Sequence, residues 1–575
     1  MHNRRTFIKA AGLASSIPAM VATTNHADAK PPMDESRLQG RNAGRSTVVA
    51  QHGMVCTSQP LASLAGIEIL KAGGNCVDAA IAANAMLGVT EAASCGIGGD
   101  LFAILWSEKD QRLFGLNASG RAPHAWNLDK ASRLGLKSIP PHSPLSWTVP
   151  GCVSGWAMLN ERFGKRTLAE CLADAIDYAA EGFPLSPIIA KSMRRWTDKD
   201  AKHLADVFHP NGQIPGYGDV FKNPRLASSY RSIAKDGADA FYKGPIAEAI
   251  VDKSKELGGY ITMGDLADHV ADWVDPVSSN YRGYDVWEIP PNGQGIAALQ
   301  MLNILENFDI GELKPNSVEH LHLVAEAKKL AFEDRAKYYA DPEFANVPTD
   351  WLISKAYAKK RAQRISLDKA STEVGHGDPQ LGSDTTYLTA ADREGNMISL
   401  IQSNYSSFGS WICPDGVGFP IQNRGRAFSL DPAHRNALAP NKRPFHTIIP
   451  AFMTKAGQPV MSFGVMGGDF QPQGHSQIVM NIVDFGMSVQ QAGEQPRLGH
   501  LGSSSPWGGT VADGGVLTFE RGIDDSVRLR LAERGHRVKP GASVLGGYQA
   551  IWREPKPTVY FGASDPRKDG SAIAW

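Results

Sequence analysis

The run Leu381-Gly-Ser-Asp-Thr-Thr-Tyr-Leu-Thr-Ala390 lies where a polar part of the chain gives way to two predicted strands. Residues 366–383 are polar, rich in Gly and Asp, and have no hydrophobic period. The runs Thr385–Ala391 and Met397–Ser403 have the composition of β-strands, and Asp392–Asn396 between them predicts a hairpin loop. We therefore expect an exposed loop to deliver a Thr-Thr pair to the first residue of a strand.

Cleavage between Asp384 and Thr385 would place a hydroxyl and a new α-amine on one residue. An α-amine has a pKa of roughly 7.7–8.0, so it can accept a proton near neutral pH without a separate histidine. This is the N-terminal threonine form of a nucleophile with its own base. A Thr-Thr pair that opens a strand is more often structural than catalytic, so this interpretation needs support from the rest of the chain.

Seven short motifs give that support, and they follow one another along the chain to its C-terminal end. They are Gly73-Gly-Asn-Cys-Val-Asp-Ala-Ala80, Cys95-Gly-Ile-Gly-Gly99, Phe241-Tyr-Lys-Gly-Pro245, Asp384-Thr-Thr386, Asn441-Lys-Arg-Pro444, Met466-Gly-Gly468 and Gly562-Ala-Ser-Asp-Pro-Arg567. In this order they resemble the γ-glutamyltranspeptidase family, over more than nine-tenths of the chain.

The resemblance implies an α+β fold, the αββα sandwich of N-terminal-nucleophile hydrolases with antiparallel sheets at its centre. It also implies one intertwined body that cleaves itself into a large subunit, residues 30–384, and a small subunit, residues 385–575. The last motif is expected to be structural and to pin the C-terminal strand.

The first 29 residues have the composition of an export signal. Asn3-Arg-Arg-Thr-Phe-Ile-Lys9 is a twin-arginine pattern, an apolar run covers residues 10–23, and Ala27-Asp-Ala29 matches a small-residue cleavage site. The apolar run is too short for a membrane-spanning helix, which needs about 20 residues. We expect residues 1–29 to be a twin-arginine signal peptide and the mature protein to be periplasmic; a disordered basic leader is the alternative.

The composition is that of an ordinary globular protein, with 42% hydrophobic and 21% charged residues. The 59 basic residues balance the 59 acidic ones, so the net charge gives no reason to expect nucleic acid or a membrane as a partner. The cysteines form no C-x-x-C pair and no zinc-finger spacing. We expect them to be small buried residues, with a disulfide as the alternative in an oxidising compartment.

Hydrophobic periodicity predicts the scaffold. The predicted helices cover residues 62–72, 77–87, 153–163, 168–180 and 319–339, and the predicted buried strands cover residues 101–106 and 459–463. In the helix over residues 319–339, Leu323, Leu330 and their neighbours lie on an apolar face, whereas Lys328, Glu333 and Lys337 lie on the opposite face.

By resemblance, four residues carry the chemistry. Thr385 is the nucleophile, and Ser403 falls where the family has a threonine whose hydroxyl supports it. Gly467 and Gly468 form the oxyanion hole, because two glycine N–H groups can point at one spot where no Cβ blocks them. No metal and no organic cofactor is required.

The residues that would bind substrate depart from the family pattern. Ser119 stands in place of an arginine that clamps the substrate's α-carboxylate; Arg121 two residues later is the candidate replacement, with a surface salt bridge as the alternative. Tyr405 stands in place of a substrate-binding asparagine, and the adjacent Asn404 is a candidate to substitute for it.

Arg424 and Ala427 stand in place of a Gln and of the Asp that binds the substrate's α-ammonium. A positive charge there favours a dianionic acyl group over a zwitterionic one, unless Arg424 is only a surface charge. His446 and Thr447 replace paired serines, and His446 is either a substrate contact or a structural histidine.

The loop that forms a lid in typical members is short in this chain, because only residues 429–441 separate Phe428 from Lys442. An open site gives water better access than a lidded one, so hydrolysis should dominate over transfer. This lid-less branch is similar to the cephalosporin (glutaryl) acylases.

We therefore expect a self-processing γ-glutamyl hydrolase/transferase that cleaves γ-glutamyl amides such as glutathione through an acyl-threonine intermediate. A glutaryl or cephalosporin acylase-type amidase is the alternative enzyme. An uncleaved, inactive periplasmic binding protein is the alternative from another class. The expected partners are small-molecule γ-glutamyl or glutaryl amides and the two subunits of one precursor.

Overall fold

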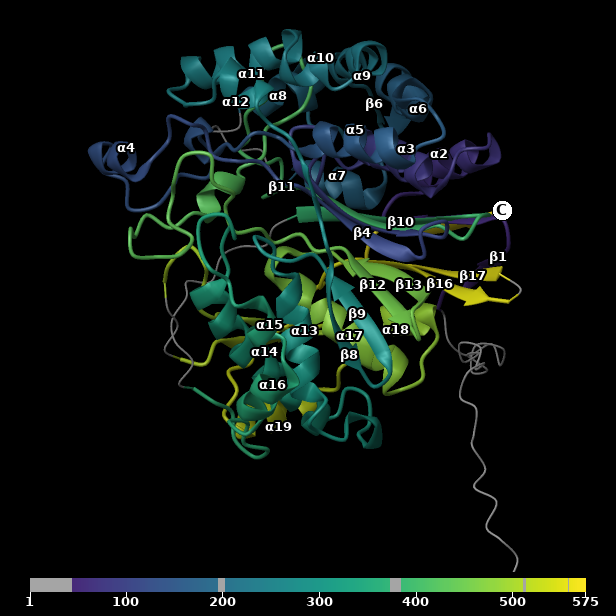
Figure 1. Ribbon diagram of the computed structural model, residues 1–575, viewed down its shortest axis with the longest axis vertical. Helices are drawn as coiled ribbons and strands as arrows, with labels where there is room; N and C mark the ends of the chain where they lie inside the picture. The colour runs from purple at the N-terminus through teal and green to yellow at the C-terminus, as the bar shows by residue number, and fades with distance from the viewer. Residues whose placement is uncertain (1–43, 195–201, 373–383, 510–512, 557) are drawn as a thin grey trace, which may run out of the picture.

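Two seven-stranded antiparallel sheets, stacked face to face, form the centre of the computed structural model (Figure 1). The structure describes residues 44–194, 202–372, 384–509, 513–556 and 558–575. The first sheet, in spatial order, consists of β18 (Ser571–Ala574), β2 (Gly53–Thr57), β10 (Asp384–Asp392), β11 (Met397–Tyr405), β3 (Asp100–Ser107), β4 (Arg112–Ala118) and β7 (Asp272–Val274). The second consists of β1 (Val48–Ala50), β17 (Thr558–Ser564), β16 (Tyr548–Pro555), β13 (Gln458–Val465), β12 (Ala451–Lys455), β9 (Tyr284–Glu288) and β8 (Val277–Tyr281).

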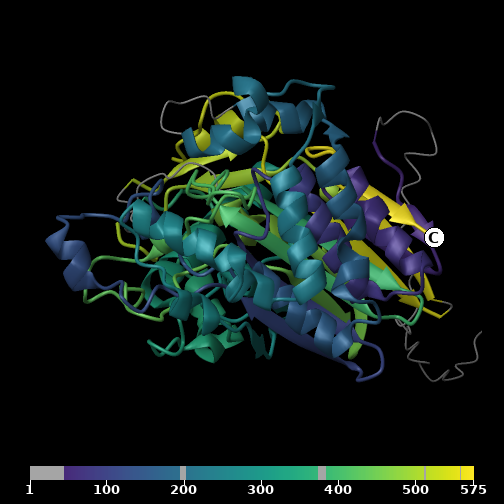
Figure 2. The same cartoon turned by 90° about the horizontal axis from the view of Figure 1, so that it is seen from above.

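Helices cover the outer face of each sheet. Over the first sheet lie α2 (Pro60–Lys71), α3 (Cys76–Thr90), α5 (Cys152–Phe163), α6 (Leu168–Glu181), α7 (Pro187–Arg194), α8 (Lys202–Phe208), α9 (Pro224–Asp236), α10 (Asp239–Tyr242), α11 (Pro245–Glu256) and α12 (Met263–Ala267). Under the second lie α13 (Gly295–Leu305), α14 (Val318–Tyr338), α15 (Thr349–Leu352), α16 (Lys355–Ala362), α17 (Gln471–Val483), α18 (Val489–Glu494) and α19 (Asp525–Glu533). From above, the upper helices lie across the strands (Figure 2). The expected αββα sandwich is confirmed.

Three hydrophobic cores match these layers. One core joins the upper helices to the first sheet, a second joins the lower helices to the second sheet, and a third, which includes Phe102, Tyr387, Ile401 and Phe452, fills the space between the sheets. Each strand of the central sheets therefore has one side chain in two facing the inter-sheet core.

The hairpin after Thr385 is confirmed, and it lies at the centre of the first sheet. β10 pairs with β11 on one side and with β2 on the other, and β11 pairs in turn with β3. β2 and β3 come from the expected large subunit and β10 and β11 from the expected small one. The second sheet also combines strands from both parts of the chain. β1, β8 and β9 precede Thr385, and the other strands of this sheet follow it. Neither part forms either sheet alone.

Local capping explains the helix pair that opens the upper layer. Gly73 has a φ of +93° and ends α2, and Asn75 then caps α3 by accepting the backbone N–H of Asp78, whose carboxylate accepts the N–H of Asn75. Every residue of α3 is buried. The helices predicted over residues 62–72 and 77–87 are confirmed.

The long helix α14 agrees with its predicted bounds but not with its predicted polar face. Lys328 is only 2% exposed, and its ammonium group donates to His500 Nδ1 at 2.9 Å and to Ser503 Oγ at 2.8 Å. β14 (Leu498–Leu501), paired with β15 (Val516–Phe519), brings His500 against this face. The predicted polar face that contains Lys328 is therefore covered at this residue, because helical periodicity carries no information on what packs against the second face.

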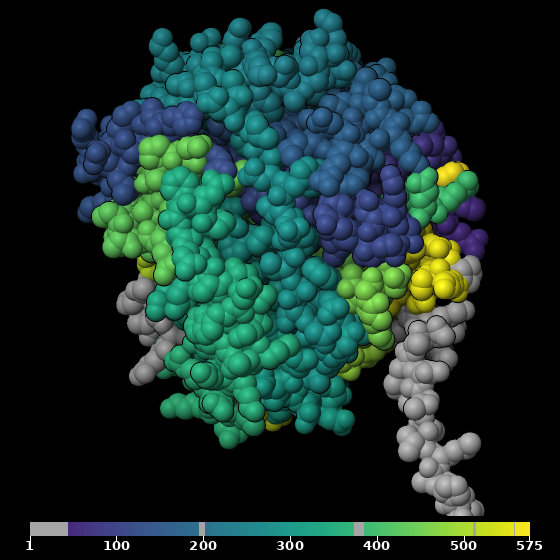
Figure 3. All heavy atoms as spheres, in the orientation of Figure 1, coloured from purple at the N-terminus to yellow at the C-terminus, as the bar shows by residue number. Residues whose placement is uncertain are grey.

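The short segment 429–441 folds on itself beside α4 (Leu128–Arg133). Ser429 N–H donates to Asn436 O at 3.0 Å, and Leu438 N–H donates to Ser429 O at 2.9 Å. Leu438 is buried in a small core with Trp126, and Figure 3 shows this part of the chain in light green against the dark blue α4 segment.

The six cysteines are all buried free thiols, as expected. Among the described residues, no helix combines the length and the apolar character needed to cross a membrane. The expected signal peptide, residues 1–29, lies outside the described residues.

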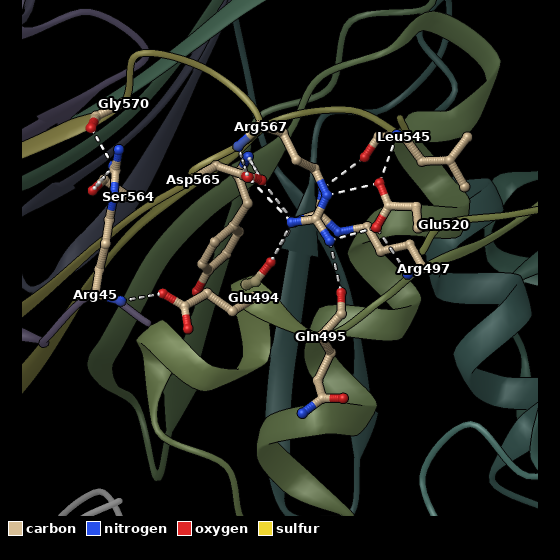
Figure 4. Close-up of polar contacts among 12 residues, drawn as sticks. Arg45, Glu494, Gln495, Arg497, Glu520, Leu545, Ser564, Asp565, Arg567 and Gly570 are labelled. Atoms are coloured by element: carbon tan, nitrogen blue, oxygen red, sulfur yellow. Dashed lines mark hydrogen bonds and ion pairs between the residues drawn. The ribbon is translucent and has the colours of Figure 1, made fainter. Parts of the chain in front are cut away.

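Two arginines, the buried Arg497 and the partly buried Arg567, hold the last strands in place (Figure 4). Arg497 Nη2 and the backbone N–H of Tyr548 donate to the Asp565 carboxylate at 2.8 and 2.7 Å. Arg567 donates to Asp565 at 3.1 Å and to Glu520 at 2.7 Å. The final motif thus has the structural environment expected of it.

Replacing Asp565 by Asn should destabilise the protein, because Arg497 would keep a buried charge with no counter-ion. Breaking a buried ion pair from one side costs about 3–5 kcal/mol. Urea denaturation measures this loss, and Glu68→Gln is the control, since it breaks the exposed Lys71–Glu68 pair (3.3 Å) and should change stability by less than about 1 kcal/mol. Equal losses in the two variants would contradict the assignment.

Candidate active site

Thr385 lies at an irregular point in the pairing of β10 with β11. Asp384 pairs with Tyr405 and Thr386 pairs with Gln402, so two residues of β11, Ser403 and Asn404, lie opposite the single residue Thr385. Such bulges recur beside active sites because they re-aim side chains. Thr385 is only 2% exposed.

The hydroxyl of Ser403 holds the hydroxyl of Thr385. Thr385 Oγ1 donates to Ser403 Oγ at 3.3 Å, and the backbone N–H of Tyr405 donates to the same oxygen at 2.8 Å. Tyr405 has a φ of +73°, a left-handed conformation at the end of β11 that aims its N–H back at Ser403. Ser403 therefore lies where it can orient a nucleophilic hydroxyl.

The facing sheet brings a glycine turn to the level of Thr385. Across the space between the sheets, Thr389 Oγ1 lies 2.5 Å from Ser462 Oγ, and Gly464 lies against the Tyr387 ring. Residues of one strand that share a face are two apart, so this register, continued along both strands, leads toward Thr385 on one side and the turn after Val465 on the other. Cross-sheet packing thus aligns the two predicted catalytic segments.

Both glycines of the turn have positive φ, +118° for Gly467 and +56° for Gly468. Residues with a Cβ are strained in that region, which explains the Gly-Gly pair. Among the described residues, neither the Gly467 nor the Gly468 N–H donates to another group. Two backbone donors at such a turn can hold an oxyanion.

Arg424 is fully buried beside this centre, which excludes the alternative that it is a surface charge. Its guanidinium lies 4.0 Å from the centroid of the Tyr405 ring, and Nη1 donates to Thr447 Oγ1 at 2.8 Å. Burial lowers the pKa of Arg424 to about 10, so it remains charged at neutral pH. Its Nε and Nη2 have no hydrogen-bond partner among the described residues.

An unpaired donor edge on a buried guanidinium is rare and calls for an acceptor. Nε–H and Nη2–H lie on one edge of the guanidinium plane, at the spacing that matches the two oxygens of a carboxylate. Arg424 therefore has the geometry of a carboxylate-binding group.

His446 has no ring nitrogen free for a substrate. Ile448 N–H donates to its Nδ1 at 3.3 Å, so the proton is on Nε2, which donates to Asp100 Oδ2 at 3.0 Å. Both side chains are fully buried. These contacts agree with the second interpretation of His446, that of a structural histidine.

Asp100 is a buried carboxyl group that the sequence analysis did not identify. Its Oδ1 accepts the N–H groups of Gly120 and Gly151 at 3.0 and 3.3 Å, and β3 places it in register with Ser403. Burial raises the pKa of Asp100 to about 7, although the charge of Arg424 acts in the opposite direction. Only its position directly after a Gly-rich turn could have drawn attention to it.

Two of the predicted substrate-binding residues use their polar groups in contacts with other parts of the protein. Arg121 donates to both carboxylate oxygens of Glu343, at 2.9 and 2.8 Å, and also lies 3.5 Å from Asp272. These are the salt bridges of the alternative interpretation. Asn404 Nδ2 donates to the carbonyls of Ala92 and Cys95, at 3.3 and 3.1 Å, beyond the end of α3. The amide nitrogen of Asn404 is therefore used by backbone carbonyls of the protein.

One group of donors has the composition of a metal site. His322, Glu326 and His536 bring their ligand atoms within 4.8 Å of one another. However, Lys329 Nζ lies 2.7 Å from Glu326 Oε1, and His322 Nδ1 lies 2.8 Å from His536 Nε2. The ammonium group of Lys329 is the cation beside Glu326, and the two histidines are hydrogen-bonded to each other. These contacts account for the cluster without a metal ion.

A groove of about 530 Å³ is lined by residues that include Lys165, Glu394 and Asn396. It borders the hairpin loop at the end of β10 that is remote from Thr385. The catalytic candidates identified here do not line it, so its size does not make it the active site.

The raised pKa of Asp100 predicts a pH-dependent contribution to stability. The unfolded carboxyl titrates near roughly 3.9, so this contribution is complete below that pH and is lost as the pH rises through about 7. Thermal melting from pH 5 to 8 should show the stability of the wild-type protein falling relative to Asp100→Asn. A difference that stays constant over this range would contradict the assignment.

Comparison with known proteins agrees with this geometry. The Gamma-glutamyltranspeptidase family model matches residues 62–575. The glutathione hydrolase-like YwrD proenzyme of Bacillus subtilis (strain 168) is 37% identical over 92% of this chain and 99% of that protein. The acylase ACY 1 proenzyme of Pseudomonas sp. (strain V22) is 34% identical over 94% and 97%. The crystal structure of the cephalosporin acylase from Bacillus halodurans superposes with a TM-score of 0.84 at 42% identity, over 93% and 98%. The chain belongs to the γ-glutamyltranspeptidase family.

Proposed function

We propose that this protein is a self-processing amidohydrolase whose nucleophile is Thr385 and whose preferred acyl group ends in a carboxylate. The observation that carries the proposal is the buried Arg424, which stacks on Tyr405, donates to Thr447 and has no partner for Nε and Nη2 among the described residues. The proenzyme names of its relatives support the self-processing part.

In self-cleavage, Thr385 Oγ attacks the carbonyl carbon of Asp384. The C–N bond breaks, the acyl group of Asp384 moves onto Oγ as an ester, and the α-amine of Thr385 is released. Water then hydrolyses the ester and leaves the Asp384 carboxylate and a free Thr385 hydroxyl. The hydrogen bond from Thr385 to Ser403 supports this step because it orients the attacking oxygen.

In substrate cleavage, the free α-amine of Thr385 takes the proton from Oγ as Oγ attacks the amide carbonyl. The N–H groups of Gly467 and Gly468 hold the oxyanion of the tetrahedral intermediate; one such donor is typically worth roughly 10²–10³ in rate. The leaving amine takes the proton, and an acyl-threonine ester remains. Water attacks this ester, releases the acid and restores Thr385.

The charge around Arg424 favours a glutaryl-type acyl group. Arg424 offers a carboxylate two parallel hydrogen bonds. Ala427 provides no negative charge for an ammonium group. A chain that ends in a single carboxylate therefore matches the site better than a zwitterionic end.

A γ-glutamyl acyl group is the second candidate, and Asp469 is the observation that favours it. This residue follows the glycine turn, its side chain is 45% exposed, and its charge acts on both Arg424 and Tyr405. It could accept an ammonium group, although Arg335 Nη1 already lies 2.7 Å from it. Hydrolysis should exceed transfer for either acyl group, because the loop 429–441 folds against α4.

The first experiment compares three substrates, glutaryl, pentanoyl and γ-glutamyl p-nitroanilide. The glutaryl and pentanoyl anilides differ only in the terminal carboxylate. Arg424→Gln should lower the ratio of their kcat/KM values by about 10- to 100-fold, since a hydrogen bond to a charged group is worth roughly 1.5–3 kcal/mol. Arg121→Gln should leave the ratio unchanged because Glu343 holds that guanidinium. An unchanged ratio in Arg424→Gln would refute this assignment.

The second experiment follows the chain on a denaturing gel. The wild-type protein should yield two fragments, the smaller of which begins with Thr385. Thr385→Ala should remain one band without amidase activity, whereas Thr385→Ser should still cleave and so report correct folding. A wild-type protein that persists as one band would instead support the uncleaved binding protein.

A further inference from the structure

Gln294 makes three buried hydrogen bonds at the centre of the site, although its type and position in the sequence predict no role. It directly precedes α13 and is fully buried. Its Nε2 donates to the carbonyls of Thr447 and Gly468 at 2.7 and 2.8 Å, and its Oε1 accepts from Arg335 Nη1 at 2.6 Å. The opposite orientation of the amide would face two carbonyls with an oxygen, so the contacts leave only one orientation.

Arg335 fixes the Gln294 amide through a hydrogen bond to its oxygen. It extends from α14, is 1% exposed, and its guanidinium lies 3.8 Å from the Phe332 ring centroid. The Nη1 that donates to Gln294 also donates to Asp469 Oδ1 at 2.7 Å. Arg335 therefore holds the residue after Gly468 directly and Gly468 itself through Gln294.

These contacts restrain a peptide that has little restraint of its own. Glycine has broad freedom in φ and ψ, so the N–H directions of Gly467 and Gly468 depend on their surroundings. The peptide plane before Gly468 is held by Phe470 N–H, which donates to Gly467 O at 3.0 Å. The plane after Gly468 is held by Gln294. Donors fixed before the reaction stabilise an oxyanion most, because they need no reorganisation.

Gln294 also links the two ends of the site. Its second acceptor, the carbonyl of Thr447, belongs to the residue whose hydroxyl accepts from Arg424. One amide thus fixes the spacing between the glycine turn and the carboxylate-binding group. Gln294 and Arg335 lie before residue 384, whereas Thr447 and Gly468 lie after it.

We propose that Gln294, held by Arg335, is a positioning residue that sets the glycine turn for oxyanion binding and fixes its distance from Arg424. This inference rests on the proposed function, in which Gly467 and Gly468 hold the oxyanion. It assigns to the large part of the chain a direct share in the alignment of groups that the small part supplies.

The test replaces Gln294 with Met, which has a similar length and cannot make the hydrogen bonds. In fully cleaved protein, kcat for the glutaryl anilide should fall about 10- to 100-fold, which is less than the roughly 10²–10³ for outright loss of an oxyanion donor, because both N–H groups remain and only their alignment is lost. KM should change less than about threefold, because the flat substrate carbonyl depends less on the turn than the oxyanion does. The inhibition constant of 4-boronobutanoate, whose boron forms a tetrahedral anion on Thr385, should rise in parallel with the fall in kcat.

Gln300→Met is the matched control. Gln300 lies in α13, the helix that Gln294 precedes, is 2% exposed, and makes buried contacts with Asp334 (2.9 Å) and Tyr339 (2.5 Å). We expect kcat and boronate inhibition to stay within about twofold of wild type even if the melting temperature falls. If Gln294→Met does not fold, Gln294→Glu replaces it, because Glu keeps the contact with Arg335 and presents no amide donor to the two carbonyls.

An unchanged kcat in a folded Gln294 variant, or equal losses in the Gln294 and Gln300 variants, would overturn the inference. Neither result would affect the proposed function. A wild-type protein that cleaves itself but hydrolyses none of the anilides would instead refute the proposed acyl specificity.

Discussion

The hydrogen bond between the hydroxyls of Thr385 and Ser403 is the interaction on which the site depends. It forms where β10 and β11 pair irregularly, in the middle of a sheet that has ordinary pairing on both sides. A hydroxyl on a loop would sample many directions, whereas this one extends from a strand whose neighbours cannot move independently. The cross-sheet contacts of Tyr387 and Thr389 then set the distance to the glycine turn. The fold thus supplies the alignment before any substrate binds.

The polar groups behind Thr385 form two sets with different electrostatics. Asp100 and His446 are buried, bonded to each other and to backbone groups, and they brace the loops that carry Gly120 and Gly151. Arg424 is equally buried but lacks partners for two of its nitrogens. Burial without a full set of partners is costly for a charged group. In Arg424 the two nitrogens without partners form a donor edge that a carboxylate can complete.

The sequence was informative where function depends on neighbouring residues. The hairpin after Thr385 and the two helices over residues 62–72 and 77–87 are local patterns, and the structure confirms each of them. The failures concern partners that are distant in the chain. Lys328 is buried because β14 packs on it, Asn404 turns toward the carbonyls beyond α3, and Arg121 meets Glu343. Gln294 and Arg335 gave no signal, since their partners at Gly468 and Asp469 lie more than a hundred residues later. No periodicity or spacing in one sequence records such contacts.

The same long-range contacts would hold the two parts of the chain together after the proposed cleavage before Thr385. A break before Thr385 removes one covalent link but none of the pairs that hold β10 between β2 and β11, from Thr386 onward. Because each sheet needs strands from both sides of the cut, the two parts cannot separate without breaking both sheets. Gln294 adds a functional reason for this interleaving, since the part that precedes the cut holds the turn that follows it. In the proposed mechanism, the new amine forms within a framework that is complete before cleavage, so formation of the base requires no further folding.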